Sequence, residues 1–425
     1  MRRFERWGMR ARVAGRGVLA RARQVLTTEP GTAPDAGQEA SARALASEAG
    51  RLRGGVGKSA QLAGYLDAFD LADDVQHALA ALWDHMEPAG ADAVEAVVRA
   101  ELGAPPAELF AGWEREPFAA ASLGQVHAAT AADGGELAVK VQYPDAAVAL
   151  CDDLSGDRLV RALAGSALGA RLSPAAIDSL RDAIRRELDY RAEAAASQRF
   201  ARALAAPDVV IPAVHAARST GRVLTMARVR GLSLAEAAAG PAPLRAAAAS
   251  AILRFSWLAP LRHGLVHGDP NPGNYLVLPG PPVQVAFLDY GCTAELDPAI
   301  RDRERDLWRA LLHRDLFAAS EQFRQALAAQ GMVASARSFG EDAYREWEHL
   351  VTAPIRERGA FAWTPDHAAR LLTATRRALR AGLLEIPPPL LLLWRHRLGV
   401  AAVLGMLGAP ADARAALESA LAGSP

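Results

Sequence analysis

Three side chains of the sequence have the types and spacing that phosphoryl transfer needs. Asp269 and Asn274 lie five residues apart in the segment His-Gly-Asp-Pro-Asn-Pro-Gly-Asn, and Asp289 begins an Asp-Tyr-Gly element after the apolar run Val-Ala-Phe-Leu. Phosphoryl transfer requires a carboxylate beside the acceptor and further oxygen ligands that hold magnesium on the nucleotide phosphates. We therefore assign Asp269 to catalysis, and Asn274 and Asp289 to the metal. Two ordinary Asp/Asn turns are the alternative, which the spacing and the order disfavour.

A lysine lies within an apolar strand pattern upstream of these residues. Lys140 is the charged residue of the run Leu-Ala-Val-Lys-Val, which is similar to the Val-Ala-Ile-Lys element of kinases. A lone strand lysine usually extends into water, so a binding role requires an acidic partner. Glu187, Asp189 and Glu193 are the candidates on the following predicted helix. Glu187 and Glu193 are six residues apart and hence lie on different faces of a helix, so we expect them to have different roles.

An alanine-rich segment stands where a kinase has its glycine-rich phosphate loop. The segment Phe-Ala-Ala-Ala-Ser-Leu-Gly includes Ala119, Ala120, Ala121 and Ser122. Alanine keeps the backbone N–H donors that bind phosphate but lacks the conformational freedom of glycine. We expect these residues to contact the nucleotide.

The elements that must position these residues change in type along the chain. Strand patterns at 123–130 and 136–143 flank an Asp-Gly-Gly turn and predict a hairpin. Ser173-Pro174 begins a helix predicted to run to about Leu204, and helical patterns dominate after residue 231. The predicted division is a basic segment with a linker at 1–38, a helical extension at 39–105, a small lobe at 106–230 and a helical lobe at 231–425.

In this order, the motifs resemble the UbiB/AarF family of atypical, protein-kinase-like proteins over about residues 50–300. The family has an alanine-rich nucleotide loop, a Lys-x-Gly-Gln motif in an N-terminal extension and a Glu-x-Asp motif. The resemblance implies an α+β, two-lobed protein-kinase-like fold with a small antiparallel-sheet lobe, a helical large lobe and a helical N-terminal extension. It also implies ATP and Mg²⁺ as cofactors, kinase or ATPase activity, and support of quinone or other isoprenoid-lipid metabolism.

The resemblance assigns residues of the N-terminal extension to the site. Lys58 and Gln61 occupy the Lys-x-Gly-Gln positions, with Ala60 in place of glycine. Glu187 and Asp189 fit the Glu-x-Asp motif, which the extension meets over the active site in the family. This arrangement implies a groove closed to protein substrates.

The resemblance also assigns residues in the two lobes. Glu193 corresponds to the glutamate that pairs with Lys140, and Met226 lies where the adenine binds. Ala227 replaces the expected hinge glutamate and Asn271 replaces the usual catalytic-loop histidine.

Two rival functions remain open. A small-molecule kinase of the aminoglycoside or choline type carries a similar His-Gly-Asp loop, although the alanine-rich segment favours UbiB. A nucleotide-binding regulator without turnover would explain Ala60 and Asn271. A P-loop at Gly-Gly-Val-Gly-Lys-Ser is excluded because Leu52 replaces its first glycine.

Composition restricts the partners and the compartment. There are 48 basic and 48 acidic residues, so no global charge favours nucleic acid, and the two cysteines lack the spacing of a zinc site. Residues 1–27 place apolar side chains among recurring arginines, and either a membrane-surface helix or a solvated terminus fits that pattern. The apolar stretch 388–409 contains Arg-His-Arg at 395–397, which disfavours a membrane span. We expect a cytoplasmic protein, peripheral at the inner membrane face if the terminus binds lipid, with a nucleotide as partner.

Overall fold

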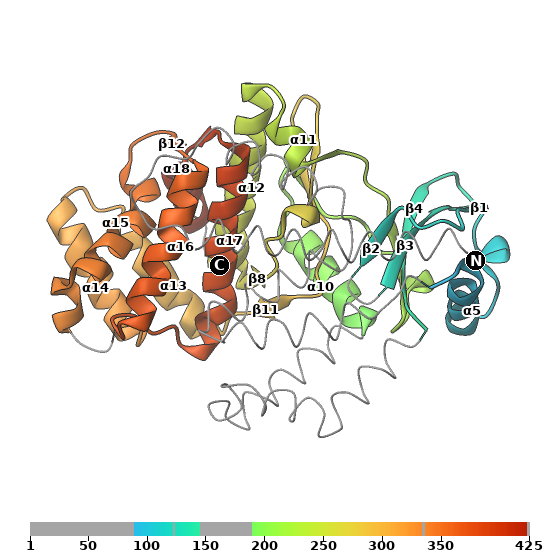
Figure 1. The fold of residues 1–425 in the computed structure, drawn as a ribbon, viewed down its shortest axis with the longest axis horizontal. Helices are drawn as coiled ribbons and strands as arrows, with labels where there is room; N and C mark the ends of the chain where they lie inside the picture. Colours follow the sequence, from blue (N-terminus) through green and yellow to red (C-terminus); the bar gives the residue numbers. More distant parts are fainter. Residues whose placement is uncertain (1–88, 122–123, 145–188, 334–335, 423–425) are drawn as a thin grey trace, which may run out of the picture. The chain divides into compact units, whose positions relative to one another are not determined.

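The computed structural model describes residues 89–121, 124–144, 189–333 and 336–422 (Figure 1). A small antiparallel sheet forms the centre of the first lobe. Its strands follow the order β1-β3-β4-β6, with β2 paired to β3. They are β1 (Gly112–Trp113), β2 (Ala119–Ala121), β3 (Gly124–Thr130), β4 (Glu136–Gln142) and β6 (Val223–Ala227). The predicted β3–β4 hairpin is confirmed, and Gly134 supplies the positive φ of +87° that its turn requires.

Helix α5 (Ala91–Leu102) packs on this sheet, and the short helix α6 (Pro106–Leu109) follows it. Val94, Val97 and Val98 lie on one face of α5 because they are three and four residues apart. They share a buried cluster with Leu137 and Val139 of β4. The end of the predicted helical extension therefore belongs to the core of the small lobe.

Helix α10 (Tyr190–Ala203) begins inside the stretch that the sequence predicts to be one continuous helix. The expected unbroken helix from Ser173 is wrong at Asp189, whose backbone is extended (φ −117°, ψ 97°). The Asp189 side chain accepts a hydrogen bond from the Arg191 backbone N–H and caps the helix. Residues 173–188 lie outside the described ranges.

Helices form most of the second lobe (Figure 1). They are α11 (Leu234–Ala238), α12 (Ala242–His263), α13 (Pro298–Ala310), α14 (Leu316–Ala329), α15 (Asp342–Arg356), α16 (Pro365–Arg380), α17 (Leu391–Leu407) and α18 (Ala413–Leu421). Short 3₁₀ turns are η1 (Ala216–Arg218), η2 (Pro272–Asn274), η3 (Ala336–Gly340) and η4 (Pro388–Leu390). The helices share one core, in which Trp308, Trp347 and Trp394 are among the largest fully buried side chains.

Short strands in this lobe carry the catalytic motifs. One sheet has the order β5-β10-β9-β7 and a second pairs β11 with β8, while β12 pairs with β13. Their bounds are β5 (Val209–Val210), β7 (Leu232–Ser233), β8 (Leu265–His267), β9 (Tyr275–Leu278), β10 (Gln284–Phe287), β11 (Thr293–Glu295), β12 (Phe361–Ala362) and β13 (Pro410–Ala411). The small antiparallel sheet and the many helices confirm the predicted α+β class.

One described helix, Pro388–Leu407, is long and apolar enough to cross a membrane by length and composition alone. Of its most apolar stretch, 56% is buried inside the protein, and α17 packs against α12 and α16. A core helix has the same character, so the stretch is weak evidence for a span.

Candidate active site

Lys140 of β4 and Glu193 of α10 form a buried ion pair. The Lys140 ammonium donates to both carboxylate oxygens of Glu193, at 2.9 and 2.8 Å, as the resemblance implies. Asp289 is a second carboxylate near this lysine, with Oδ2 at 3.8 Å from Lys140 Nζ. Lys140 is 8% exposed and Glu193 6%. Burial alone would lower the pKa of Lys140, but the negative charges of Asp289 and Glu193 outweigh it and hold that pKa well above its usual value.

The catalytic loop places Asp269 against Asn274. The loop leaves β8, turns through η2 and enters β9. Asn274 Nδ2 donates to Asp269 Oδ2 at 2.8 Å and to the Asp269 backbone carbonyl at 3.0 Å. Because the Asn274 NH₂ group donates these two hydrogen bonds, the amide oxygen is the atom of this side chain that can bind a cation.

The unusual Asn271 has a local structural role. Its Oδ1 accepts a hydrogen bond from the Gly273 N–H at 2.8 Å and caps η2. Asparagine therefore shapes the turn that brings Asn274 back to Asp269, at the position where the family usually has histidine.

Strand pairing brings Asp289 to the same place. Strands β9 and β10 are antiparallel with Phe287 opposite Tyr275, and the Leu288 N–H donates to the Asn274 carbonyl at 3.0 Å. The Asp289 carboxylate accepts from the Gly291 N–H at 2.9 Å. The register thus places Asp289 beside Asn274, as the sequence predicts.

The alanine-rich segment forms the outer part of a hairpin. Ala119 and Ala121 of β2 lie opposite Val126 and Gly124 of β3, and Ala120 lies opposite Gln125. Val126 in turn lies opposite Lys140, so the hairpin runs directly beside the lysine. A Cβ on Gly124 would lie 2.1 Å from the Val141 carbonyl oxygen, so this close approach requires glycine.

Other predicted residues lie at the edge of this group or outside the described ranges. Met226 of β6 is partly buried opposite Ala138 of β4. The backbone N–H of the neighbouring Ala227 donates to the Ala213 carbonyl at 2.8 Å, so adenine would use other backbone groups there. Asp189 caps α10. The remaining predicted site residues, Lys58, Gln61, Glu187 and Ser122, lie outside the described ranges.

The donor set fits magnesium bound together with phosphates. Asp289 and Asn274 offer a carboxylate and an amide oxygen, which are hard ligands of the kind that Mg²⁺ prefers. Within the described ranges, no group of three or more His, Cys, Asp or Glu side chains could hold a metal by itself. A magnesium ion here would therefore need nucleotide phosphates or water to complete its ligands.

Sequence reasoning missed Arg395. This residue of α17 places Nη2 at 3.2 Å from Asp269 Oδ1. The signal was the charged triplet at 395–397 inside an apolar helix, which we took only as an argument against a membrane span. A charged side chain in an apolar helix also requires a partner of opposite charge. Asp269 is 126 residues away from Arg395 in the sequence, so the pattern around Arg395 did not identify it.

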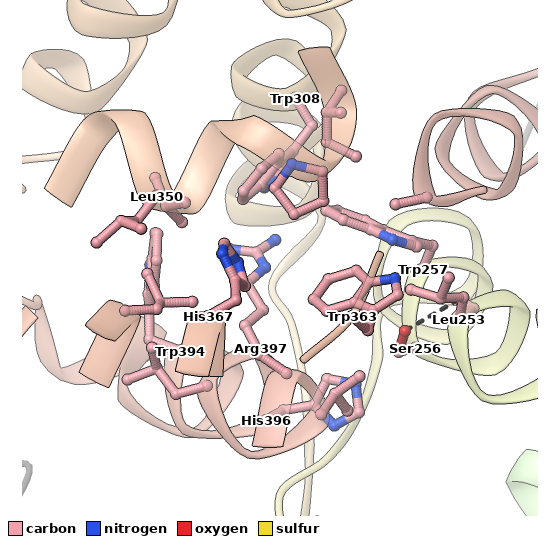
Figure 2. Close-up of a pocket in the computed structure, with 18 residues that line it drawn as sticks. Leu253, Ser256, Trp257, Trp308, Leu350, Trp363, His367, Trp394, His396 and Arg397 are labelled. Atoms are coloured by element: carbon pink, nitrogen blue, oxygen red, sulfur yellow. Dashed lines mark hydrogen bonds between the residues drawn. The ribbon is translucent and has the colours of Figure 1, made fainter. Parts of the chain in front are cut away.

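A separate cavity of about 60 Å³ lies among the helices of the second lobe (Figure 2). Trp308, Trp363, Trp394 and Arg397 are among its lining residues. Its lining includes none of the predicted phosphotransfer residues, so the cavity is distinct from that site.

Residues 81–323 match the model of the ABC1 atypical kinase-like domain. Among curated relatives, the uncharacterized protein Rv0647c of Mycobacterium tuberculosis is 36% identical over 262 residues, which cover 59% of this chain and 52% of the relative. The probable protein kinase UbiB of Marinobacter nauticus is 30% identical over 346 residues, covering 78% and 60%. The chain spans about half the length of the first curated relatives it matches. A solved structure of Rv3197 of M. tuberculosis with erythromycin has a TM-score of 0.62 at 26% identity, covering 89% of this chain and 95% of that one.

Proposed function

Since the chain belongs to the ABC1 (UbiB/AarF) atypical kinase-like family, as its motifs predict, we propose that it binds ATP with Mg²⁺ and transfers or hydrolyses the γ-phosphoryl group. The observation that carries the proposal is the contact of Lys140 with both Glu193 and Asp289. This contact brings a cation for phosphate next to a carboxylate suited to magnesium, and it joins the sheet lobe to the catalytic motifs.

Each residue then has a defined task. Lys140, oriented by Glu193, would bind nucleotide phosphates, and the β2–β3 hairpin would offer them backbone N–H groups. Asn274 and Asp289 would hold magnesium, which when bound neutralises the charge of the phosphates. Asp269 would orient an acceptor hydroxyl or water and take its proton while the bond to the γ-phosphorus forms and the bond to the leaving oxygen breaks.

A binding and turnover assay on the purified chain tests the proposal. Nucleotide affinity is measured with Mg²⁺ and with EDTA, followed by phosphate release alone and with lipid micelles. Magnesium-dependent binding with phosphate release supports the proposal. Transfer that occurs only to an aminoglycoside or to choline would favour the small-molecule kinase, and tight binding without turnover would favour the regulator.

The role of the activity is proposed from the family. The resemblance to UbiB, and relatives such as the mitochondrial atypical kinase COQ8B of Rattus norvegicus, support a role in quinone or isoprenoid-lipid metabolism. That relative is 27% identical and the chain covers 55% of its length. A protein that acts on such lipids would work at a membrane surface, which agrees with the basic pattern of residues 1–27.

A further inference from the structure

Helix α17 lies against the catalytic loop in a regular register. Leu392, Arg395 and Gly399 are three and four residues apart and so share one face of the helix. They meet three successive loop residues: Leu392 meets Gly268, Arg395 meets Asp269, and Gly399 meets Pro270.

Helix α17 and the catalytic loop lie very close together at the first and the last of these three contacts. A Cβ on Gly268 would lie 2.4 Å from Leu392 Cδ1, and a Cβ on Gly399 would lie 2.1 Å from Pro270 Cγ. Distances this short cannot occur between real carbon atoms. Gly399 is therefore needed for the helix to lie this close to the Pro270 ring, and a side chain at position 268 would displace that of Leu392. Between them, Arg395 reaches the Asp269 carboxylate.

We propose that Arg395 is a positioning residue for phosphoryl transfer and that the C-terminal helix α17 is thereby part of the catalytic unit. The inference rests on the proposed function. Arg395 Nη2 binds Asp269 Oδ1 at 3.2 Å, and Asn274 Nδ2 binds Oδ2 at 2.8 Å. Two bonds to different oxygens restrain both the direction and the rotation of the carboxylate.

The charge of Arg395 serves the same purpose. Asp269 is 5% exposed, and a carboxylate removed from water is costly without a counter-charge. Arg395 Nη1 also lies 3.9 Å from the Cys292 thiol, which follows the Asp-Tyr-Gly element. One guanidinium therefore contacts both the loop of Asp269 and the loop of Asp289.

The other side of α17 is held by the core of the lobe. Arg397 pairs with buried Glu304 at 2.6 Å and lies over the rings of Trp308 and Trp394 (Figure 2). This anchoring fixes the backbone two residues from Arg395. The helix lies beyond residue 323, where the match to the family domain ends.

The test compares Arg395→Met and Arg395→Lys with wild type. We expect Arg395→Met to lower kcat by about tenfold or more, because a small misplacement of a catalytic group has effects of this size. The Kd of MgATP should stay within about twofold, because Asp269 and Cys292, which Arg395 contacts, are not proposed nucleotide ligands. Arg395→Lys should recover part of kcat, because it restores the charge but not the planar fork.

Two further variants keep the test decisive. Arg377→Gln removes an exposed ion pair between Arg377 of α16 and Glu346 of α15 and should leave kcat unchanged. Gly399→Ala keeps the Arg395 side chain but pushes α17 away from Pro270 and so moves Arg395 relative to Asp269; it should lower kcat even if Arg395→Met does not fold. The inference about Arg395 would be overturned if folded Arg395→Met, or Gly399→Ala, had the kcat of wild type. The proposed function would not be affected by that result. A wild type that binds MgATP but never turns it over refutes the proposed function and, with it, this inference.

Discussion

Glu193 holds Lys140 through both of its carboxylate oxygens, at 2.9 and 2.8 Å, and the pair is buried between the sheet and α10. In a kinase-like site this pairing sets the lysine where it can bind phosphate. The pair therefore fixes the position of the lysine on the small-lobe side of the site.

The Lys140–Glu193 pair should contribute to the free energy of unfolding as well as to nucleotide binding. Lys140→Met leaves Glu193 buried without its counter-charge, and we expect the free energy of unfolding to fall by about 3 kcal/mol. Glu193→Gln should be destabilising too. In denaturant unfolding, Lys140→Met/Glu193→Gln should be at least about 1 kcal/mol more stable than the sum of the single changes predicts, since the two residues interact. Additive effects would show that the contact contributes little.

Asp289→Asn should separate metal-dependent from metal-independent binding. The change removes a negative charge from a hard-cation site, so MgATP affinity should fall at least about tenfold, while the affinity for ATP in EDTA should not fall. Asp302→Asn, at an exposed position of α13, is the matched control. Titration calorimetry measures both affinities, and undiminished MgATP binding by Asp289→Asn would remove Asp289 from the metal site.

Stability should fall in mild acid because of a buried histidine. Burial, together with the nearby His267 and Arg397, lowers the pKa of His396 to about 3. The folded protein therefore resists protonation that the unfolded chain accepts below about pH 6.5. His396 therefore costs no stability above pH 6.5. Between pH 6.5 and pH 3 its effect lowers the free energy of unfolding by about 1.4 kcal/mol for each pH unit of acidification. Urea unfolding at pH 7.5 and 5.5 should show a smaller loss for His396→Gln than for wild type, and an equal loss would contradict the assignment.

Membrane attachment, if the basic terminus provides it, should depend on residues 1–27. Each arginine near an anionic surface contributes about 1 kcal/mol, and salt weakens this attraction. Deletion of 1–27 should abolish sedimentation with anionic liposomes at low salt. Equal sedimentation of the two forms would place the anchor elsewhere.

The motifs predicted which residues lie together where those residues are close in sequence. Asp269, Asn274 and Asp289 could be placed together because a tight turn and one strand pairing connect them. Arg395 could not, because its contact depends on how α17 packs on the loop, and the close approaches at Gly268 and Gly399 become visible only in the packed structure. The start of α10 was missed for the opposite reason: a local cap by Asp189 begins a helix at a point where periodicity alone predicts an uninterrupted one.

The most direct test of the account is the comparison of Asp269→Asn with wild type for MgATP binding and for turnover. Asparagine keeps the size of the side chain but cannot accept the proton of the acceptor, so MgATP should bind within about threefold of wild type while kcat falls by at least about a hundredfold. Turnover by Asp269→Asn at the rate of wild type would contradict the assignment of this site to phosphoryl transfer.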